Sequence, residues 1–267
     1  MHPVINIFSL NIPSYSLFIM LGIITAVLLS LLFYKRSGIK RDDLLNSWVV
    51  SVIGLLIGGK VLYLLPRLRD MWADREYIFS NSALFLQKYF SGGFVFYGGL
   101  ILGLFFIILY CRKYKAAVSN ALGHIAIFIP LAHAAGRVGC FFAGCCYGVQ
   151  TDGAIGIYFT QSIVAPNNVP LVPVQLFESA VNFAIFIVLF IVGKNEKSKN
   201  GYLLLGLYLL LYSVSRFILE FFRGDLERGL LLGVSTSQII SLLLLPISIG
   251  IIIIAKKRPA EQKNENK

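Results

Sequence analysis

Seven long apolar stretches run through this chain of 267 residues, and they constrain its fold more than any other feature. About 20 helical residues cross the roughly 30 Å of hydrocarbon in a bilayer, so a run of this length predicts a transmembrane helix. The predicted spans are 16–34, 47–65, 95–111, 121–141, 174–193, 202–222 and 235–255. We therefore expect an all-α, polytopic membrane protein with seven transmembrane helices.

The composition excludes a soluble protein of ordinary kind. Hydrophobic residues make up 57% of the chain and charged residues only 14%, with a mean hydropathy of +0.76. A soluble domain carries about 25% charged residues, because it must cover its surface with them. The net charge of +11 does not indicate nucleic-acid binding, since the basic residues follow the loops of a membrane protein.

The distribution of lysine and arginine predicts the orientation. The loops around 35–41, 112–115 and 194–199 and the tail after 255 hold 15 of the 24 basic residues, and the opposite loops hold 6. Basic loops remain on the cytoplasmic side, so the N-terminus is expected outside and the C-terminus inside. We interpret residues 1–255 as a single transmembrane domain and 256–267 as a basic cytoplasmic tail.

The span at 121–141 is the least regular, because glycine is frequent toward its end. A helix that ends in a turn is expected there, or a re-entrant segment, which is tolerated where it is packed in protein or lines a wet cavity.

Three basic side chains fall inside predicted spans, where an ionisable group costs at least roughly 2.5–3.5 kcal/mol. Lys60 either extends to the outer surface as a snorkelling lysine or faces an anion beside Tyr63. Arg216 shares a helical stripe with Glu220 and Arg223, which predicts either a self-neutralising pair or a cationic face toward an anionic headgroup.

The third buried cation, Arg137, lies in a segment rich in small residues. His133 precedes it by one turn, and Gly136 and Gly139 flank it. Small residues at this spacing also pack helices against each other in membranes. Because an arginine accompanies the glycines, we favour a phosphate site.

Further polar clusters stand at the outer edges of the third and fifth spans. Tyr97 lies between glycine pairs, and Gln175 and Glu178 are one turn apart. Polar groups that converge in one leaflet predict a pocket for a lipid headgroup that opens to the outside.

Cysteine spacing gives little indication of function. Cys140, Cys145 and Cys146 form neither a Cys-x-x-Cys pair nor the paired doublets of a zinc site. We therefore expect no metal and no cofactor. Membrane thiol-redox chemistry remains an alternative.

These motifs together resemble the prolipoprotein diacylglyceryl transferase family. Gly136-Arg137-Val138-Gly139-Cys140-Phe141-Phe142-Ala143-Gly144-Cys145 is similar to the family signature Gly-Arg-x-Gly-Asn-Phe-x-Asn-Gly-Glu. Other matching segments, in chain order, are Tyr15, Gly58 to Tyr63, Tyr97 to Leu100, Pro173 to Glu178, Arg216 to Arg223 and Ser237-Gln238. The resemblance covers nearly the whole chain.

The resemblance implies transfer of a diacylglyceryl group from phosphatidylglycerol to the lipobox cysteine thiol of a prolipoprotein signal peptide, in the bacterial cytoplasmic (inner) membrane. Arg137 and Arg216 are the expected catalytic cations, with Glu220 orienting Arg216. Tyr97 stands where the family has histidine and is expected to donate a hydrogen bond. The alternative is a diverged member that binds phospholipid or uses another acceptor.

The expected substrate-binding residues follow from the same motifs. They are Tyr15, Lys60, Tyr63, Gly98, Gly99, Gly136, Gly139, Cys140, Gly144, Cys145, Gln175, Glu178 and Arg223.

Overall fold

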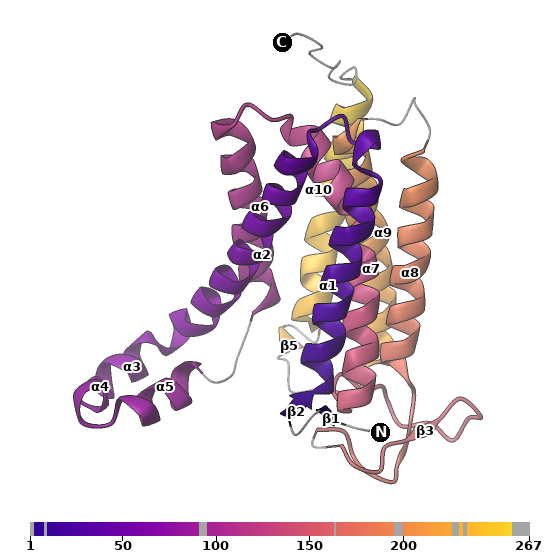
Figure 1. The fold of residues 1–267 in the computed structure, drawn as a ribbon. Helices are drawn as coiled ribbons and strands as arrows, with labels where there is room; N and C mark the ends of the chain where they lie inside the picture. Colours follow the sequence, from indigo (N-terminus) through magenta and orange to yellow (C-terminus); the bar gives the residue numbers. More distant parts are fainter. Residues whose placement is uncertain are drawn as a thin grey trace. The chain divides into compact units, whose positions relative to one another are not determined.

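The structure is a computed structural model that describes residues 3–7, 10–90, 95–162, 164–194, 200–225, 230–231 and 234–257. It divides into two compact units (Figure 1). One unit comprises Met1–Gly38 with Leu122–Lys267, and the other comprises Ile39–Ala121.

Within the described residues, five long helices build the larger unit, and α7 enters it at residue 122. They are α1 (Ser14–Leu32), α7 (Val118–Ala143), α8 (Val174–Val192), α9 (Gly201–Leu219) and α10 (Thr236–Lys257). Short 3₁₀ turns, η1 (Tyr34–Arg36) and η4 (Glu220–Phe222), follow α1 and α9. The antiparallel strand pairs are β1 (Val4–Ile7) with β2 (Leu10–Pro13), β3 (Ile157–Tyr158) with β4 (Pro170–Leu171), and β5 (Leu230–Leu231) with β6 (Val234–Ser235).

Helices α1 and α7 run in opposite directions and touch through small residues. A Cβ atom added to Gly22 would lie 2.7 Å from the Ala135 Cβ, and one added to Gly139 would lie 3.2 Å from the backbone of Tyr15. Near the other end of the contact, the His124 Nε2 lies 3.0 Å from the Ser30 carbonyl oxygen. Such close backbone approach is typical of helix packing in membranes.

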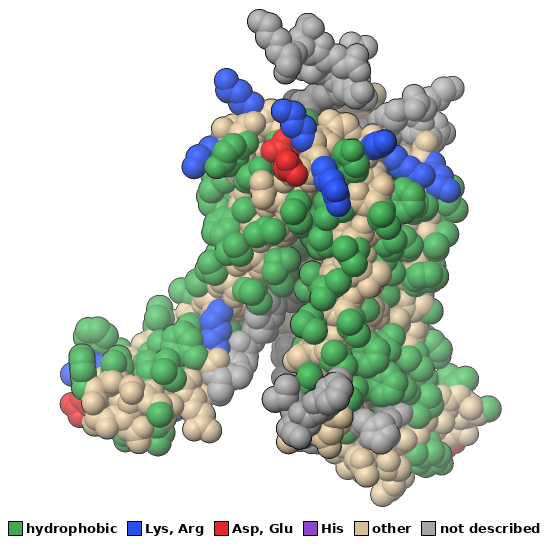
Figure 2. Space-filling model, viewed as in Figure 1, with side chains coloured by type: hydrophobic (Ala, Val, Ile, Leu, Met, Phe, Trp, Pro, Cys, Tyr) green, Lys and Arg blue, Asp and Glu red, His purple; other side chains and the backbone are tan. Residues whose placement is uncertain are grey.

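The surface of this unit is apolar where a soluble helix would be polar. In α1 the buried residues are Ser14, Gly22, Ala26 and Ser30. The exposed large residues of α1 include Met20, Leu21, Ile24, Leu28 and Leu32. Figure 2 shows the same apolar covering along the visible helices. Small residues inside and large apolar residues outside fit a protein whose solvent is lipid.

In the part of the chain that the structure describes, six helical segments are long and apolar enough to cross a membrane. They are Ser14–Leu32, Arg41–Ala73, Val118–Ala143, Val174–Val192, Gly201–Phe222 and Thr236–Lys257. The protein is thus an all-α, multi-pass membrane protein, as the hydrophobic pattern predicts.

The smaller unit consists of two long helices and short ones between them. Its elements are α2 (Arg41–Leu64), η2 (Leu65–Arg67), α3 (Leu68–Ala73), α4 (Tyr77–Ser80), α5 (Ser82–Phe90) and α6 (Phe96–Lys113). A Cβ atom on Gly58 would lie only 2.2 Å from the Gly98 carbonyl oxygen, and one on Gly99 2.6 Å from the Leu55 carbonyl oxygen. The glycines therefore let the backbones of α2 and α6 touch.

The structure shows how the least regular span and the loop after the second span are built. The span around 121–141 is a continuous helix that contains Pro130 and ends in a turn at Gly144, which is the first of the two predicted alternatives. The helices α3, α4 and α5 lie between the second and third predicted spans. Of the predicted tail, Lys256 and Lys257 still belong to α10, and 258–267 lie outside the described residues.

Candidate functional site

Glu178 is the centre of a buried ionic cluster in the larger unit. Its side chain is 3% exposed, and its Oε2 lies 2.8 Å from Nη1 of Arg137. Its Oε1 accepts a hydrogen bond from Nη1 of Arg216, and the Nη1 of Arg223 lies 3.4 Å from the same oxygen. One carboxylate thus joins three guanidinium groups. A buried charge persists only with such compensation.

Arg216 is held by two further groups. Its Nη2 lies 2.6 Å from Oε2 of Glu220, one turn further along the chain, and donates to the Ser237 hydroxyl at 3.1 Å. The intrahelical pair is the one that the spacing indicates. The pair and the bond to Glu178 are both present, so Arg216 connects α9 to α8.

Arg223 completes the cluster from the segment after η4. It forms a bidentate pair with Asp225, in which Nε and Nη2 donate to the two carboxylate oxygens at 2.9 and 2.7 Å. The backbone there pairs with the segment after α7, where Gly148 and Arg223 form an antiparallel bridge. Three guanidinium groups therefore face three carboxylates, those of Glu178, Glu220 and Asp225.

All parts of the cluster come from the same end of the helix bundle. Arg137 lies near the end of α7, Glu178 near the start of α8, Arg216 in the last turn of α9 and Ser237 in the first turn of α10. Neighbouring helices that run in opposite directions bring these ends together. The bond from the Ser179 hydroxyl to the Ala134 carbonyl, 3.0 Å long, joins α8 to α7 at this level.

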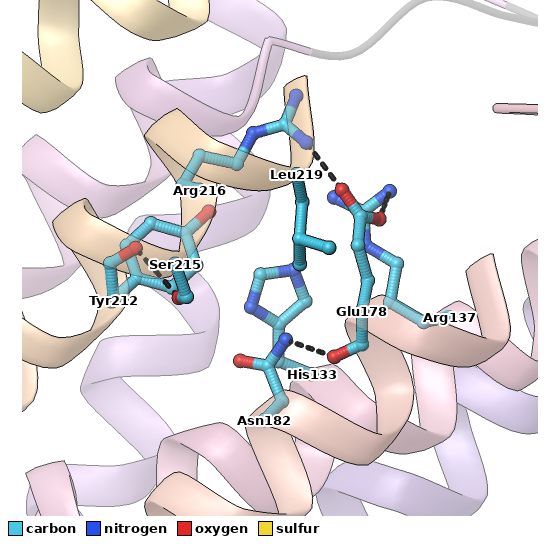
Figure 3. A pocket seen from close by; sticks show the side chains of 8 residues that line it. All are labelled: His133, Arg137, Glu178, Asn182, Tyr212, Ser215, Arg216 and Leu219. Carbon is cyan, nitrogen blue, oxygen red and sulfur yellow. Dashed lines mark hydrogen bonds and ion pairs between the residues drawn. The ribbon is translucent and has the colours of Figure 1, made fainter. Parts of the chain in front are cut away.

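A small pocket opens between the arginines (Figure 3). Its lining residues are His133, Arg137, Glu178, Asn182, Tyr212, Ser215, Arg216 and Leu219. The Asn182 amide donates to the Glu178 carbonyl at 2.7 Å, while its buried Oδ1 accepts no hydrogen bond from the described residues. The pocket thus combines two cations with an unsatisfied acceptor.

Arg137 differs from its two neighbours in how fully it is engaged. Within the described residues, its single ion pair is the one through Nη1 to Glu178, and its side chain is 14% exposed. A guanidinium carries five N–H donors in one plane. Arg137 therefore keeps donors that a ligand in the pocket can use.

The turn after α7 lies beside this cluster. Gly144 has a φ of +71°, which favours glycine, and Cys146 has a φ of +58°. The Gln175 side chain donates to the Cys145 carbonyl at 2.8 Å, and the Ser162 hydroxyl donates to the Gly144 carbonyl at 2.9 Å. Gln175 thus supports the turn by its amide group.

Within this region, the expected site glycines serve different purposes. Gly139 lets α1 approach, whereas a Cβ atom at Gly136 would meet the Ile19 side chain only at 3.8 Å. Gly144 allows the turn. Tyr15 lies beside Gly139 at the start of α1.

Other predicted site residues belong to the smaller unit. The Lys60 ammonium donates to the Phe90 carbonyl at 3.2 Å and lies 4.9 Å from the centre of the Tyr63 ring. Gly98 and Gly99 contact the backbone of α2, and the packing of these two helices explains their small size. The side chain of Tyr97 lies outside the described residues.

Asn182 was not predicted to belong to the site, and Ser237 was noted only as part of a family motif, without a role in the site. Asn182 follows Glu178 by one helical turn, and this spacing could have indicated it. Ser237 is brought in by tertiary packing of α10 alone.

The structure brings three cysteines closer together than their spacing along the chain indicates. The Sγ atoms of Cys140, Cys145 and Cys146 all lie within 4.8 Å of one another, because the turn folds the chain back onto the end of α7. Spacing along the chain could not reveal this, since it depends on two left-handed residues.

The fold and site define a class: a multi-pass membrane protein with an arginine–carboxylate cluster buried at one end of a helix bundle, beside a small pocket. A model of the family described as prolipoprotein diacylglyceryl transferase matches residues 3–254. The chain belongs to this family, and the resemblance of its motifs is confirmed.

Relatives agree along almost the entire length. A protein of Clostridium tetani (strain Massachusetts / E88), named phosphatidylglycerol–prolipoprotein diacylglyceryl transferase, is 38% identical over 260 residues, which cover 97% of this chain and 99% of the relative. One of Clostridium perfringens (strain 13 / Type A), named phosphatidylglycerol–prolipoprotein diacylglyceryl transferase 2, is 38% identical over 240 residues, or 90% of each chain. One of Clostridioides difficile (strain 630), with the first name, is 31% identical over 239 residues, 89% of this chain and 88% of the relative.

Proposed function

We propose that this protein transfers a diacylglyceryl group from phosphatidylglycerol to the thiol of the lipobox cysteine in a prolipoprotein signal peptide. Its family and the names of its relatives support this transferase activity. The observation that carries the proposal for the site is the convergence of Arg137 and Arg216, from two helices, on one pocket beside Glu178.

The reaction requires a place where negative charge can accumulate on a phosphate. The acceptor sulfur attacks the glyceryl carbon next to the phosphate ester, the carbon–oxygen bond breaks, and glycerol phosphate leaves with the bond's electron pair. The leaving phosphate gains a charge. Fixed cations in a site that excludes water stabilise such charge strongly.

Arg137 is the residue that we assign to direct phosphate contact. Its guanidinium retains donors beyond the one that faces Glu178, and its planar fork matches two phosphate oxygens. Arg216 would add a second cation from another helix, α9. Glu220 and Ser237 hold Arg216 in place by the bonds described above.

The thiol proton needs an acceptor. His133 lines the pocket one turn before Arg137, and its ring centre lies 5.4 Å from that of Tyr212. The two neighbouring cations, Arg137 and Arg216, line the same pocket and oppose protonation of the imidazole, so we do not assign His133 as the base. The proposed substrate contacts at Tyr15, Lys60, Tyr63, Tyr97 and Gln175 come from the family motifs.

We also propose a finer topology. Helix α6, of 18 residues, is counted as a further span, which makes seven. The basic ends of η1, α6 and α10 are placed in the cytoplasm, and the N-terminus outside, by the positive-inside rule. The cluster would then open toward the outer leaflet of a bacterial inner membrane, with residues 1–255 as one membrane domain.

Reconstitution tests the activity. The purified protein is incubated in detergent with phosphatidylglycerol and a synthetic lipobox peptide, and mass spectrometry follows the peptide and released glycerol phosphate. We expect a diacylglyceryl thioether on the cysteine peptide and none on a matched serine peptide. Bound phosphatidylglycerol without any product would instead indicate a lipid-binding member without this activity.

Variants test the site separately. Arg137→Ala and Arg216→Ala should each lower kcat/KM by about 100-fold or more, as expected when one charge-stabilising donor is removed. Arg112→Ala, at the exposed end of α6, is the matched control and should retain activity. Full activity in both pocket variants would refute the site while leaving the reaction intact.

A further inference from the structure

Three thiols gather where α7 ends. Cys140 lies in the last turn of the helix and is 5% exposed, while Cys145 and Cys146 are half-buried in the turn that follows. Their Sγ atoms all lie within 4.8 Å of one another, and the described residues form no disulfide. Cys140 and Cys145 stand among the expected substrate-binding residues, but the bond-making and bond-breaking steps of the proposed transfer assign no role to any of the three thiols.

The backbone holds this arrangement firmly. The Cys145 amide donates to the Cys140 carbonyl at 3.1 Å, which brings the turn back over the helix end. Gln175, from α8, and Ser162, from the following loop, bind the carbonyl groups of Cys145 and Gly144. A turn that is fixed from two other segments presents its side chains in a defined direction.

The spacing of the sulfur atoms suits a metal ion. Zinc–thiolate bonds of about 2.3 Å in tetrahedral geometry place the sulfur atoms about 3.8 Å apart. Side-chain rotations that move each sulfur atom by less than about 1 Å would therefore bring all three onto one ion. Thiolate ligands select soft ions such as Zn²⁺ or Cu⁺ over Mg²⁺ and Ca²⁺.

The charged side chains around the three thiols also favour a bound metal ion. Three thiolates on a divalent ion leave one net negative charge, which would be costly in an apolar surrounding without a cation. Arg137 lies about one helical turn before Cys140 on α7. The backbone of Arg223 pairs with Gly148, which follows Cys146 by two residues. Both guanidinium groups are therefore positioned to offset that charge.

We propose that Cys140, Cys145 and Cys146 bind one thiophilic metal ion of the Zn²⁺ class at the end of α7. Binding would form three metal–sulfur bonds and release up to three thiol protons to solvent, with no change of oxidation state. The fourth coordination position is left for water. The ion would fasten the turn beside the arginine cluster.

Direct binding tests the proposal without reference to catalysis. The full-length protein, purified without a histidine tag and under reducing conditions, is stripped of metal and titrated with Zn²⁺ against a chromophoric chelator. We expect one Zn²⁺ per chain. Co²⁺ as a substitute should give thiolate charge-transfer and tetrahedral d–d absorption bands.

Two variants separate the site from general thiol binding. The first is a double variant, Cys145→Ser with Cys146→Ser, which changes the two half-buried positions. It should lose the bound ion and the Co²⁺ bands. Cys111→Ser, which alters the remaining cysteine, on α6, should keep both. Zn²⁺ should raise the thermal midpoint of the parent and of Cys111→Ser but not of the double variant.

Several results would overturn the proposal. One is that the reduced parent binds no Zn²⁺ in a saturable manner, and another is that the double variant binds Zn²⁺ as tightly as the parent. A thermal midpoint of the metal-free double variant close to that of the metal-free parent shows that it is folded. If the variant is unfolded, single Cys145→Ser and Cys146→Ser substitutions provide the same comparison.

Discussion

At the scale of single residues, Glu178 determines how three arginines are arranged. Arg137, Arg216 and Arg223 come from α7, from α9 and from the segment after it, and they meet at its carboxylate. Positive groups so close together repel one another unless an anion separates them. The arrangement of the three guanidinium groups at the pocket therefore depends on a single negative charge.

Glu178→Gln tests this dependence, because it removes the charge and keeps the shape. Removal of one partner from a buried ionic group costs about 3–5 kcal/mol, and the side chain is 3% exposed. We expect a thermal midpoint several degrees lower and a loss of transfer activity. Scanning fluorimetry in detergent measures the first, and the peptide assay the second.

Asp152→Asn is the control, since it removes a carboxylate from an exposed position in the loop after α7. It should change neither quantity. Equal midpoints for both variants would mean that the arginines find their positions without Glu178.

The sequence predicted some of these residues and not their common centre. The pair of Arg216 and Glu220 follows from one helical turn, so local spacing was sufficient. The bonds from Glu178 to Arg216 and Arg223 join residues 38 and 45 positions apart. Such contacts depend on how helices rotate against each other, and periodicity does not determine rotation when most faces are apolar.

At the scale of elements, close packing of α2 and α6 depends on glycine. Gly58→Ala would place a methyl group 2.2 Å from the Gly98 carbonyl oxygen, so the helices must separate. We expect a loss of about 1–3 kcal/mol in stability, the usual cost of overpacking. Thermal unfolding in detergent measures the change.

Gly250→Ala in α10 is the matched substitution, because a Cβ atom there would meet nothing within 4 Å. It should leave the thermal midpoint unchanged or raise it slightly, since alanine favours helix over glycine. A similar decrease for both variants would contradict the packing explanation.

Helix α5 is joined to the end of α3 by a carboxylate. Lys88 and Tyr89 donate to Oδ2 of Asp74 at 2.5 and 2.6 Å. The hydrogen bond from Lys88, with that from Tyr89, lowers the pKa of Asp74 below 3.8, and the bond to Asp74 raises the pKa of Lys88 above 10.5. Because the pKa of Asp74 is lower in the folded chain than in the unfolded chain, the ionised carboxylate stabilises the fold at a pH above its pKa in the unfolded chain. This stabilisation is lost as the pH falls through the pKa of Asp74 in the folded chain.

Hydrogen exchange of α5 amides tests this contact. Protection should stay constant between about pH 5 and 9 and decrease in stronger acid, after correction for the intrinsic exchange rate. Because the pKa of Lys88 is raised, the stabilisation by its ammonium group is lost only at a pH above this range. Asp74→Asn should lose protection already at neutral pH, whereas Asp70→Asn, in the first turn of α3, should not. Unchanged protection in Asp74→Asn would exclude a role for the carboxylate.

At the scale of the whole molecule, the helix boundaries agree with the hydrophobic pattern within a few residues, except where helices extend beyond the apolar core. Helix α2 begins at Arg41, six residues before the predicted span, because its first turn is polar and carries Asp42 and Asp43. Apolar content indicates how much of a helix lies in lipid. It does not indicate how far the helix continues into water.

Reporter fusions test the proposed topology. A cytoplasmic fluorescent protein joined after residue 115 should be active, and an exported phosphatase joined there should not. The opposite result is expected for fusions after residue 152, in the loop that follows α7. If each reporter gives the same signal at the two positions, residues 115 and 152 lie on the same side and a single crossing by α7 is excluded.

The division of the chain into units has a consequence for biogenesis. Residues 39–121 separate α1 from most of its own unit, and α1 packs through Gly22 and Tyr15 against the part of α7 around 132–139. At about 5–20 residues per second, a ribosome needs about 4–16 s to synthesise that intervening segment. During this interval the small residues of α1 have no helix to pack against. Lipid or the insertion machinery must therefore cover them until α7 has been synthesised.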